Sequence, residues 1–528
     1  MTAPNAKRVL VLHPFWLAAY PVLALLTHNL GWTTPSEALR ALLFSLAGAA
    51  FLTGVYWLLA RDIYRAGLLA SLTVLIFFSY GHIYGLLKAG GLGASIGRHR
   101  YLAPAMALIF VLVAVGILRR VRDARPATTA LNVMSGVLVA LPLISLVANA
   151  LQPPQPARVS TPATELRLPE GQPPPDVYYI ILDAYARQDT LQRVYGFDNT
   201  PFLDFLRERG FFVAEAATSN YAQTGLSLAS SLNMNYLDAL LPELGAESRG
   251  RQSLWDIILH SEVRRQLEGL GYETVAFSTG LPGTEWRDAD VYLSPGTVDE
   301  TLSLQGANPF ESMLAQTTLV RLVSDGVVAL PRFIPTLDYP YEVHRTRIAY
   351  ILDNLGRLSV PDRPRFIFAH IVSPHPPFVF GAEGQPLTPD APFTLRFTFD
   401  ASDPSHEEYL EGYSDQVAFV NRELERIIAS ILSQSSTPPV IILQGDHGPD
   451  SNTGRVSYVQ ERMTIFNAYL LPSGDAGLYA GISPVNSFRV VFNQVFGGTY
   501  PRLPDRVLYS EYDKPYSFFD VTNDIHSP

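Results

Sequence analysis

Five long apolar stretches dominate the first 151 residues of the chain. They cover about residues 9–30, 38–60, 66–87, 101–118 and 127–151, and short charged loops separate them. Each stretch approaches or exceeds the ~20 residues that an α-helix needs to cross a bilayer. A cleaved signal peptide would account only for the first stretch, and a soluble core seldom holds five such helices in succession. The pattern predicts a transmembrane domain of five helices over residues 1–151.

Lysine and arginine are unevenly distributed among the loops between these stretches. One set of loops carries Lys7, Arg8, Arg61, Arg65, Arg119, Arg120, Arg122 and Arg125, and the other carries Lys88, Arg98 and Arg100, with Arg40 at a helix edge. Loops rich in Lys and Arg stay in the cytoplasm. The N-terminus is therefore predicted to lie inside, and five crossings place the chain after residue 151 outside. The expectation is a multi-pass protein of the cell membrane with an extracytoplasmic domain.

Residues 152–176 are rich in proline, which is excluded from helix interiors and inner strands. This stretch is predicted to be an extended, semi-rigid linker.

Short apolar runs and amphipathic helical patterns alternate in the remainder of the chain. The runs "VYYIIL" (177–182), "ETVAFST" (273–279), "RFIFAHI" (365–371) and "PVIILQ" (439–444) are typical of strands buried on both faces. Helical spacing appears in residues 200–210 and 407–432. The alternation predicts one α/β domain, residues 177–528, with a largely parallel central sheet and helices on both faces.

Composition narrows the chemistry. The chain has no cysteine, which excludes disulfides, zinc–cysteine sites and cysteine nucleophiles. Residues 1–151 carry 12 Lys/Arg against 3 Asp/Glu, whereas the remainder carries 27 against 46. An acidic main domain is not expected to bind nucleic acid.

Acidic and imidazole side chains gather at the carboxyl ends of the predicted strands, where open α/β sheets bind ligands. They are Asp183 after the first strand, His370 and His375 at and beyond the third, and Asp446 with His447 after the fourth. Taken singly, Asp183 could cap a turn, His370 could be a core histidine, and His375 could be a loop residue. The adjacent pair Asp446–His447 indicates a site more strongly. Its flanking Gly445 and Gly448 are expected to let the backbone turn sharply there without a Cβ clash.

Thr224 is the candidate nucleophile. It opens an apolar helical pattern within "SNYAQTGLSLASSLNMNYL" (219–237). A hydroxyl at this position can cap the helix, and the sequence by itself favours that role. It can also act as a nucleophile, because a helix N-terminus and a divalent cation both favour an alkoxide.

The chain resembles the alkaline phosphatase and sulfatase superfamily in the order of four features: Asp183, Thr224, "HIVSPHPPF" and "GDHG". With the five-helix domain, the chain resembles lipoteichoic-acid synthases and lipid phosphoethanolamine transferases more closely. The stretch "ERMTIFNAYLLP" (461–472) resembles the strand-forming segment that follows the "DHG" motif in those proteins.

The resemblance implies roles for named residues. Asp183, Thr224, Asp446 and His447 would bind metal, and Thr224 would be the nucleophile. His375 would contact the substrate phosphate and assist catalysis, with His370 also near the substrate. Trp286 and Arg287, in "GTEWRDADVYL", resemble an aromatic–arginine pair near the lipoteichoic-acid site, although the spacing differs.

Departures from the superfamily pattern restrict the activity. Formylglycine-dependent sulfate-ester hydrolysis is not expected, because the chain lacks cysteine and residues 225–237, directly after Thr224, contain no Arg. No histidine occurs between His447 and His526, so one metal ion is expected rather than two. Oxygen-rich ligation with one imidazole fits Mn²⁺ or Mg²⁺, and Zn²⁺ is also compatible.

The predicted function is therefore transfer of a phospholipid-derived headgroup, of the phosphoglycerol or phosphoethanolamine type, to a glycan or lipid acceptor at the outer membrane face. Two alternatives remain open at this stage. One is a phosphodiesterase or phosphatase of the same fold that uses water as acceptor. The other is a non-catalytic, lipid-binding pseudo-enzyme.

Overall fold

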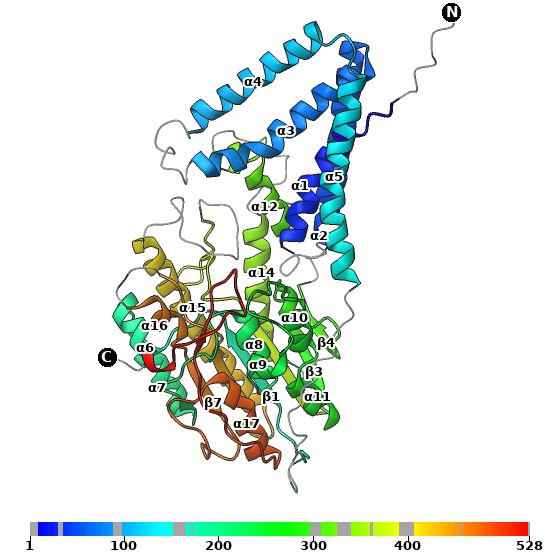
Figure 1. Cartoon of the computed structure of the whole chain (residues 1–528). Helices are drawn as coiled ribbons and strands as arrows, with labels where there is room; N and C mark the ends of the chain where they lie inside the picture. Colours follow the sequence, from blue (N-terminus) through cyan, green and yellow to red (C-terminus); the bar gives the residue numbers. More distant parts are fainter. Residues whose placement is uncertain are drawn as a thin grey trace, which may run out of the picture. The chain divides into compact units, whose positions relative to one another are not determined.

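The chain forms two compact units (Figure 1). The computed structural model describes residues 9–29, 35–87, 98–151, 165–168, 171, 173–295, 308–324, 339–358, 363–389, 406–451, 454 and 456–525. The first unit comprises residues 1–153, 299–340 and 390–403, and the second comprises residues 154–298, 341–389 and 404–528. Most of the predicted proline-rich linker lies outside the described residues.

Five helices of the first unit form from the five apolar stretches, as predicted. They are α1 (His13–His28), α2 (Pro35–Ala60), α3 (Ile63–Leu87), α4 (His99–Arg120) and α5 (Arg125–Ala150). Helices α2 to α5 are long and apolar enough to cross a membrane, whereas α1 has 16 residues. Large apolar side chains such as Leu112, Val133 and Ile144 are more than 60% exposed. Apolar surface on this scale indicates contact with lipid.

Two further helices of the first unit come from a later part of the chain, α12 (Pro309–Thr317) and α13 (Arg321–Ser324). Asn308 and Glu311 form a capping box at the start of α12. Glu311 also forms an ion pair with Arg40 of α2, in which Arg40 Nε donates to Glu311 Oε1 at 2.6 Å. Phe310 is fully buried in a cluster that includes Leu17 of α1. Residues 308–324 thus fold with the N-terminal helices although they lie far along the chain.

A seven-stranded sheet forms the centre of the second unit, in the order β2–β7–β6–β1–β5–β3–β4. The strands are β1 (Val177–Leu182), β2 (Phe212–Val213), β3 (Glu273–Phe277), β4 (Val291–Leu293), β5 (Arg365–Ile371), β6 (Val440–Gly445) and β7 (Asn467–Leu470). The neighbours β6–β1–β5–β3–β4 pair in parallel, and β7 pairs antiparallel with both β6 and β2. The predicted, largely parallel sheet is confirmed.

The remaining elements of the second unit surround this sheet. In chain order they are α6 (Gln188–Thr190), the π-helix η2 (Leu191–Tyr195), α7 (Thr200–Glu208), α8 (Thr224–Leu232), α9 (Leu237–Leu240), α10 (Gln252–Leu259), α11 (Glu262–Gly269), the 3₁₀-helix η3 (Pro282–Thr284), α14 (Tyr339–Asn354), the 3₁₀-helix η4 (Leu355–Arg357), α15 (His406–Gln434), α16 (Tyr458–Met463), α17 (Pro484–Val495), the hairpin strands β8 (Leu508–Tyr509) and β9 (Phe519–Asp520), and α18 (Thr522–Ile525).

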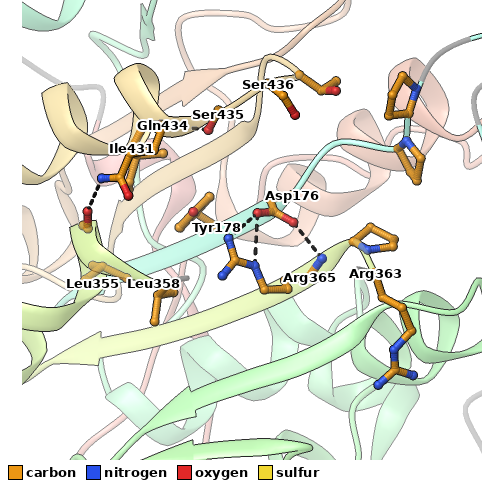
Figure 2. Close-up of a pocket in the computed structure, with 15 residues that line it drawn as sticks. Asp176, Tyr178, Leu355, Leu358, Arg363, Arg365, Ile431, Gln434, Ser435 and Ser436 are labelled. Atoms are coloured by element: carbon orange, nitrogen blue, oxygen red, sulfur yellow. Dashed lines mark hydrogen bonds and ion pairs between the residues drawn. The ribbon is translucent and has the colours of Figure 1, made fainter. Parts of the chain in front are cut away.

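Helices cover both faces of the sheet. Successive side chains of a strand point to opposite faces, so the neighbours of Tyr178 and Tyr179 in β1 show which helices lie on each face. On one face, the Tyr179 hydroxyl lies 2.8 Å from Ser231 Oγ of α8, and its ring packs edge-on against Phe488 of α17. On the other face, Tyr178 lines a cavity of about 200 Å³ together with Ile431 of α15 (Figure 2). The helices on both faces were also predicted.

That cavity lies at the amino ends of the central strands, next to the Asp176–Arg365 ion pair at 2.7 Å (Figure 2). Asp176 precedes β1, whereas Asp183 follows it. The cavity is therefore at the opposite end of the strands from the predicted ligands.

Candidate active site

The carboxyl ends of β1, β5 and β6 bring the predicted ligands together. Leu182, the last residue of β1, is in register with Gly445 of β6 on one side and Ile371 of β5 on the other. Asp183 and Asp446 follow directly, and the Asp183 amide donates to the Ile371 carbonyl at 3.0 Å. The three strands are buried along their whole length, so they provide a rigid base for these side chains.

Four of the predicted residues surround one point of this edge. His447 Nε2 lies 3.2 Å from Thr224 Oγ1, 3.5 Å from Asp446 Oδ2 and 3.7 Å from Asp183 Oδ1. Asp183, Asp446 and His447 are each at most 2% exposed. Residues separated by more than 260 positions in sequence therefore meet in one buried cluster.

The Asp446–His447 turn is held by hydrogen bonds on every side. Asp446 Oδ1 accepts from the backbone amides of Ala184 and His447, at 3.0 and 2.9 Å. The Ser219 hydroxyl donates to the Asp446 carbonyl at 2.6 Å. Ala184 has φ 62°, in the left-handed region that costs a non-glycine residue about 1–2 kcal/mol. Backbone strain of this kind is often found at functional sites.

Gly445 and Gly448 are required by close backbone approach. Neither residue has a positive φ. A Cβ on Gly448 would lie 2.1 Å from the Glu461 carbonyl oxygen, and one on Gly445 would lie 2.6 Å from that of Tyr185. The expected Cβ clash is therefore real, but it comes from neighbouring backbone and not from a sharp turn.

Thr224 is the first residue of α8, and its hydroxyl faces His447. The preceding Gln223 occupies the N-cap position with extended backbone, and no side chain caps this helix. The capping role that the sequence favoured for Thr224 has no hydrogen bond to support it. The helix instead presents the hydroxyl to the cluster.

The two carboxyl groups have opposite electrostatic environments. Burial alone would raise the pKa of Asp183, but the neighbouring His375, His370 and His447 lower it well below its usual range. Burial, and then the charge of Asp183, raises the pKa of Asp446 to about 6. Burial, and then the charge of Arg462, lowers the pKa of His447 well below its usual range. His447 is therefore neutral at physiological pH.

The tautomer of His447 follows from its neighbours. His447 Nδ1 lies 2.9 Å from the Gly448 carbonyl oxygen, which can only accept a hydrogen bond. Nδ1 therefore carries the proton, and the lone pair of Nε2 points at the cluster. Neutral imidazole held in this way is the form that binds metal ions.

The cluster fits a divalent cation. Asp183 Oδ1 and Asp446 Oδ2 are buried, and no donor in the described part of the chain bonds to either atom. Leaving buried carboxylate oxygens unsatisfied is costly unless a cation or a proton joins them. Asp183, His370 and Asp446 also offer ligand atoms within 4.8 Å of one another. A cation could thus be held by both carboxylates with His447, Thr224 or His370.

His370 and His375 lie beside Asp183. His370 is fully buried, with Nε2 3.3 Å from Asp183 Oδ2 and Nδ1 3.1 Å from Thr284 Oγ1. The His375 amide donates to the Asp183 carbonyl at 3.0 Å, which joins the "HPPF" segment to the end of β1. The His375 and His447 rings are 6.3 Å apart. His370 therefore contacts the acidic cluster directly, and His375 lies next to it.

Trp286 and Arg287 are placed differently from the rest. Trp286 is fully buried and stacks on Phe368 of β5 at 4.2 Å, with Arg264 over its ring. The Arg287 side chain is 72% exposed and lies 3.9 Å from Glu285. Among the described residues, neither side chain contacts the acidic cluster. The buried Trp286 ring cannot meet a substrate, and the Arg287 side chain pairs with Glu285 at the surface, so neither residue is part of the cluster.

The structure adds two residues that the sequence did not indicate. Arg462 Nη2 lies 3.2 Å from His447 Nε2, the atom that also faces Thr224. His344 of α14 is buried, and burial, followed by the influence of His375, lowers its pKa to about 3. Arg462 lies in the stretch 461–472, for which the sequence indicated only a strand, and His344 lies in no motif, so only the fold reveals them.

Comparison with solved structures gives matches of low identity. The C-terminal periplasmic domain of EptC from Escherichia coli, in complex with Zn, is 12% identical with a TM-score of 0.39, covering 68% of this chain and 96% of that one. The lipooligosaccharide phosphoethanolamine transferase EptA from Neisseria meningitidis is 11% identical with a TM-score of 0.37, covering 92% and 95%. A 2-O GAG sulfatase is 14% identical with a TM-score of 0.36, covering 63% and 77%.

Comparison with curated proteins gives no match. The family model named Sulfatase matches residues 175–483, the region that contains every residue of the acidic cluster. Since this match covers more than half of the 528 residues, the chain belongs to the Sulfatase family.

Proposed function

We propose that this protein is a metal-dependent phospho-group transferase that acts at the outer face of the cell membrane through Thr224. The observation that carries the proposal is the meeting of Thr224 Oγ1, His447 Nε2 and two buried carboxylates at one point. A hydroxyl at a helix N-terminus beside a cation site is the arrangement that an activated oxygen nucleophile requires.

Asp183, Asp446, His447 and Thr224 would hold one divalent cation, either Mn²⁺ or Mg²⁺, with Zn²⁺ as a further candidate. When bound, the cation would favour the Thr224 alkoxide and offset negative charge on the phosphate oxygens. The chain's own residues position the reacting atoms. The α8 backbone directs Thr224 at the cluster, and the Gly448 carbonyl orients the His447 ring.

The reaction takes place in two displacements. Thr224 Oγ1 attacks the phosphorus of a phospholipid headgroup, forming a P–Oγ1 bond as the bond to the diacylglycerol oxygen breaks. The hydroxyl proton leaves to water, and the departing alkoxide takes a proton from water. An acceptor hydroxyl then attacks the same phosphorus and loses its proton, and Thr224 leaves and is protonated again. His375, beside Asp183, is suited to contact the phosphate oxygens.

The membrane helices support a lipid donor of the phosphatidylglycerol or phosphatidylethanolamine type and a glycan or lipid acceptor. A donor lipid is confined to the bilayer, so an enzyme anchored there meets its substrate in two dimensions. The excess of Lys and Arg in one set of loops supports placement of the second unit outside the cytoplasm.

Intact-mass analysis of the purified full chain tests the proposal. The protein is incubated with Mn²⁺ and either phosphatidylglycerol or phosphatidylethanolamine, without acceptor. One of the two donors should leave a covalent adduct with the mass of its phospho-headgroup on Thr224. Absence of any adduct, together with full turnover by Thr224→Ala, would refute the nucleophile. Free headgroup phosphate released without an acceptor would instead indicate a hydrolase.

A further inference from the structure

We propose that Arg462 is a catalytic residue that binds an oxygen of the transferred phosphoryl group. The inference rests on the proposed function, because that function supplies the phosphoryl group that the Arg462 guanidinium would bind. Arg462 lies in α16, after the "GDHG" segment. It is part of the stretch 461–472, but the sequence assigned it no role in the site.

Arg462 is fixed to the Asp446–His447 turn by both its backbone and its side chain. The Gly448 amide donates to the Arg462 carbonyl at 2.7 Å. In return, Arg462 Nη1 donates to the Gly448 carbonyl at 2.8 Å, and Nε donates to the Ala222 carbonyl at 2.9 Å. Two of the three guanidinium nitrogens are thus anchored to loops on either side of the site. The third nitrogen, Nη2, points at the cluster.

The guanidinium group, held through Nε and Nη1, directs Nη2 to the point where the reaction would occur. Nη2 lies 3.2 Å from His447 Nε2, and Thr224 Oγ1 lies 3.2 Å from the same atom. When His447 Nε2 ligates a cation, its lone pair no longer accepts from Arg462. The Nη2 donor is then free to bond an oxygen of the phosphoryl group on Thr224.

Charge supports the same assignment. Arg462 is half-buried and forms an ion pair with none of the carboxylates in the described ranges, its N–H groups being directed at two carbonyls and one imidazole. Its charge lowers the pKa of Asp450, which burial raises, but the two groups do not pair. A partly buried guanidinium without an anionic partner is costly. Guanidinium groups bind phosphate oxygens strongly, and negative charge builds up on those oxygens in the transition state.

Inorganic phosphate binding to the Mn²⁺-loaded full chain, measured by calorimetry in detergent, tests the inference. The variant R462Q should bind phosphate at least about tenfold more weakly, the effect of one charge-assisted hydrogen bond. R462K keeps the charge but loses the fork, so it should also bind more weakly. Metal content by mass spectrometry should be unchanged in both, because Asp183, Asp446 and His447 remain.

Arg489 offers a matched control for the hydrogen bonds that Arg462 donates to backbone carbonyls. Its Nε and Nη1 also donate to two carbonyls, those of Met234 and Pro501, and the residue is 5% exposed. R489Q should lower the melting temperature but leave phosphate affinity unchanged. Loss of phosphate affinity in R462Q but not in R489Q supports direct contact.

Three outcomes would overturn the inference. One is wild-type phosphate affinity in folded R462Q or, where that variant fails to fold, in R462K. Another is metal binding by the Arg462 variants but not by the wild-type chain. That result would mean that the Arg462 guanidinium occupies the place of the metal ion. The third is a wild-type chain that binds neither metal nor phosphate, which would overturn the proposed function and this inference with it.

Discussion

Asp183 and Asp446 are two buried carboxyl groups on neighbouring strands, yet their pKa values move in opposite directions. Histidines lower the pKa of Asp183, whereas burial and the adjacent Asp183 raise that of Asp446 to about 6. The difference shows that, without a cation, the cluster tolerates one full negative charge more readily than two. A divalent cation would remove this conflict, because it neutralises both charges.

Asp446→Asn separates metal binding from folding. Because the pKa of Asp446 is raised, ionising it at neutral pH costs free energy in the metal-free protein. The neutral amide should therefore leave the melting temperature of the metal-free protein equal or higher. Its Oδ1 can still accept from the Ala184 and His447 amides. Metal affinity should fall at least about tenfold, since loss of outer-shell partners alone has effects of that size. A variant that retains full metal content by mass spectrometry would contradict the assigned ligand.

Thr224→Ala distinguishes a nucleophile from a helix cap. The variant should lose the covalent adduct entirely, whereas Thr224→Ser, which keeps a hydroxyl, should retain it. Because no side chain caps α8, the Ala variant should lose less than the ~1 kcal/mol typical of a lost cap. Intact mass and denaturant unfolding of the same three proteins provide the check. Normal turnover by Thr224→Ala would rule out the mechanism.

Sequence reasoning at the residue scale predicted positions where a residue directly follows a buried strand. The position of Asp183 and Asp446 at one edge of the sheet is confirmed, because parallel strands end at the same edge, and their roles stay predictions. Arg462 and His344 could not be found in this way, since both lie in helices, α16 and α14, and neither directly follows a strand. The resemblance placed Trp286 near the substrate, but its aromatic ring packs on Phe368, a contact that no local pattern encodes.

At the scale of elements, α16 packs closely against the turn that follows β6. Residues 461–472 were predicted to resemble a strand-forming segment, but residues up to Met463 are helical and β7 begins at Asn467. The helical turn is what brings the Glu461 and Arg462 carbonyls against Gly448. The strand pattern was correct for β7, but the sequence did not reveal the short helix that precedes it.

Gly448→Ala tests this close packing. The added methyl would meet the Glu461 carbonyl oxygen at 2.1 Å, and backbone cannot move aside cheaply. Overpacking of this kind costs about 1–3 kcal/mol of stability, measurable as a lower midpoint in denaturant. Gly481→Ala is the matched control, because its nearest neighbour is the Ala216 carbonyl oxygen at 3.9 Å. Equal stability of the two variants would show that the approach of α16 is not tight.

At the scale of the whole molecule, α12 packs on the N-terminal helices. Its Glu311 pairs with Arg40 of α2, and the Leu319 amide beyond its end donates to the Phe77 carbonyl of α3. These contacts are compatible with either membrane orientation. The prediction of a cytoplasmic N-terminus therefore rests on the Lys/Arg asymmetry of the loops.

Single-cysteine labelling can test this orientation directly, because the chain has no native cysteine. Leu151→Cys, at an exposed position after α5, should react with a membrane-impermeant maleimide on intact cells. Asp123→Cys, exposed between α4 and α5, should react only after permeabilisation. Replacing Asp123 leaves the neighbouring arginines in place, so the substitution does not weaken the charge asymmetry that sets the topology. Labelling of Asp123→Cys but not Leu151→Cys on intact cells would place the second unit inside. That result would exclude transfer at the outer face, whatever the chemistry of the site.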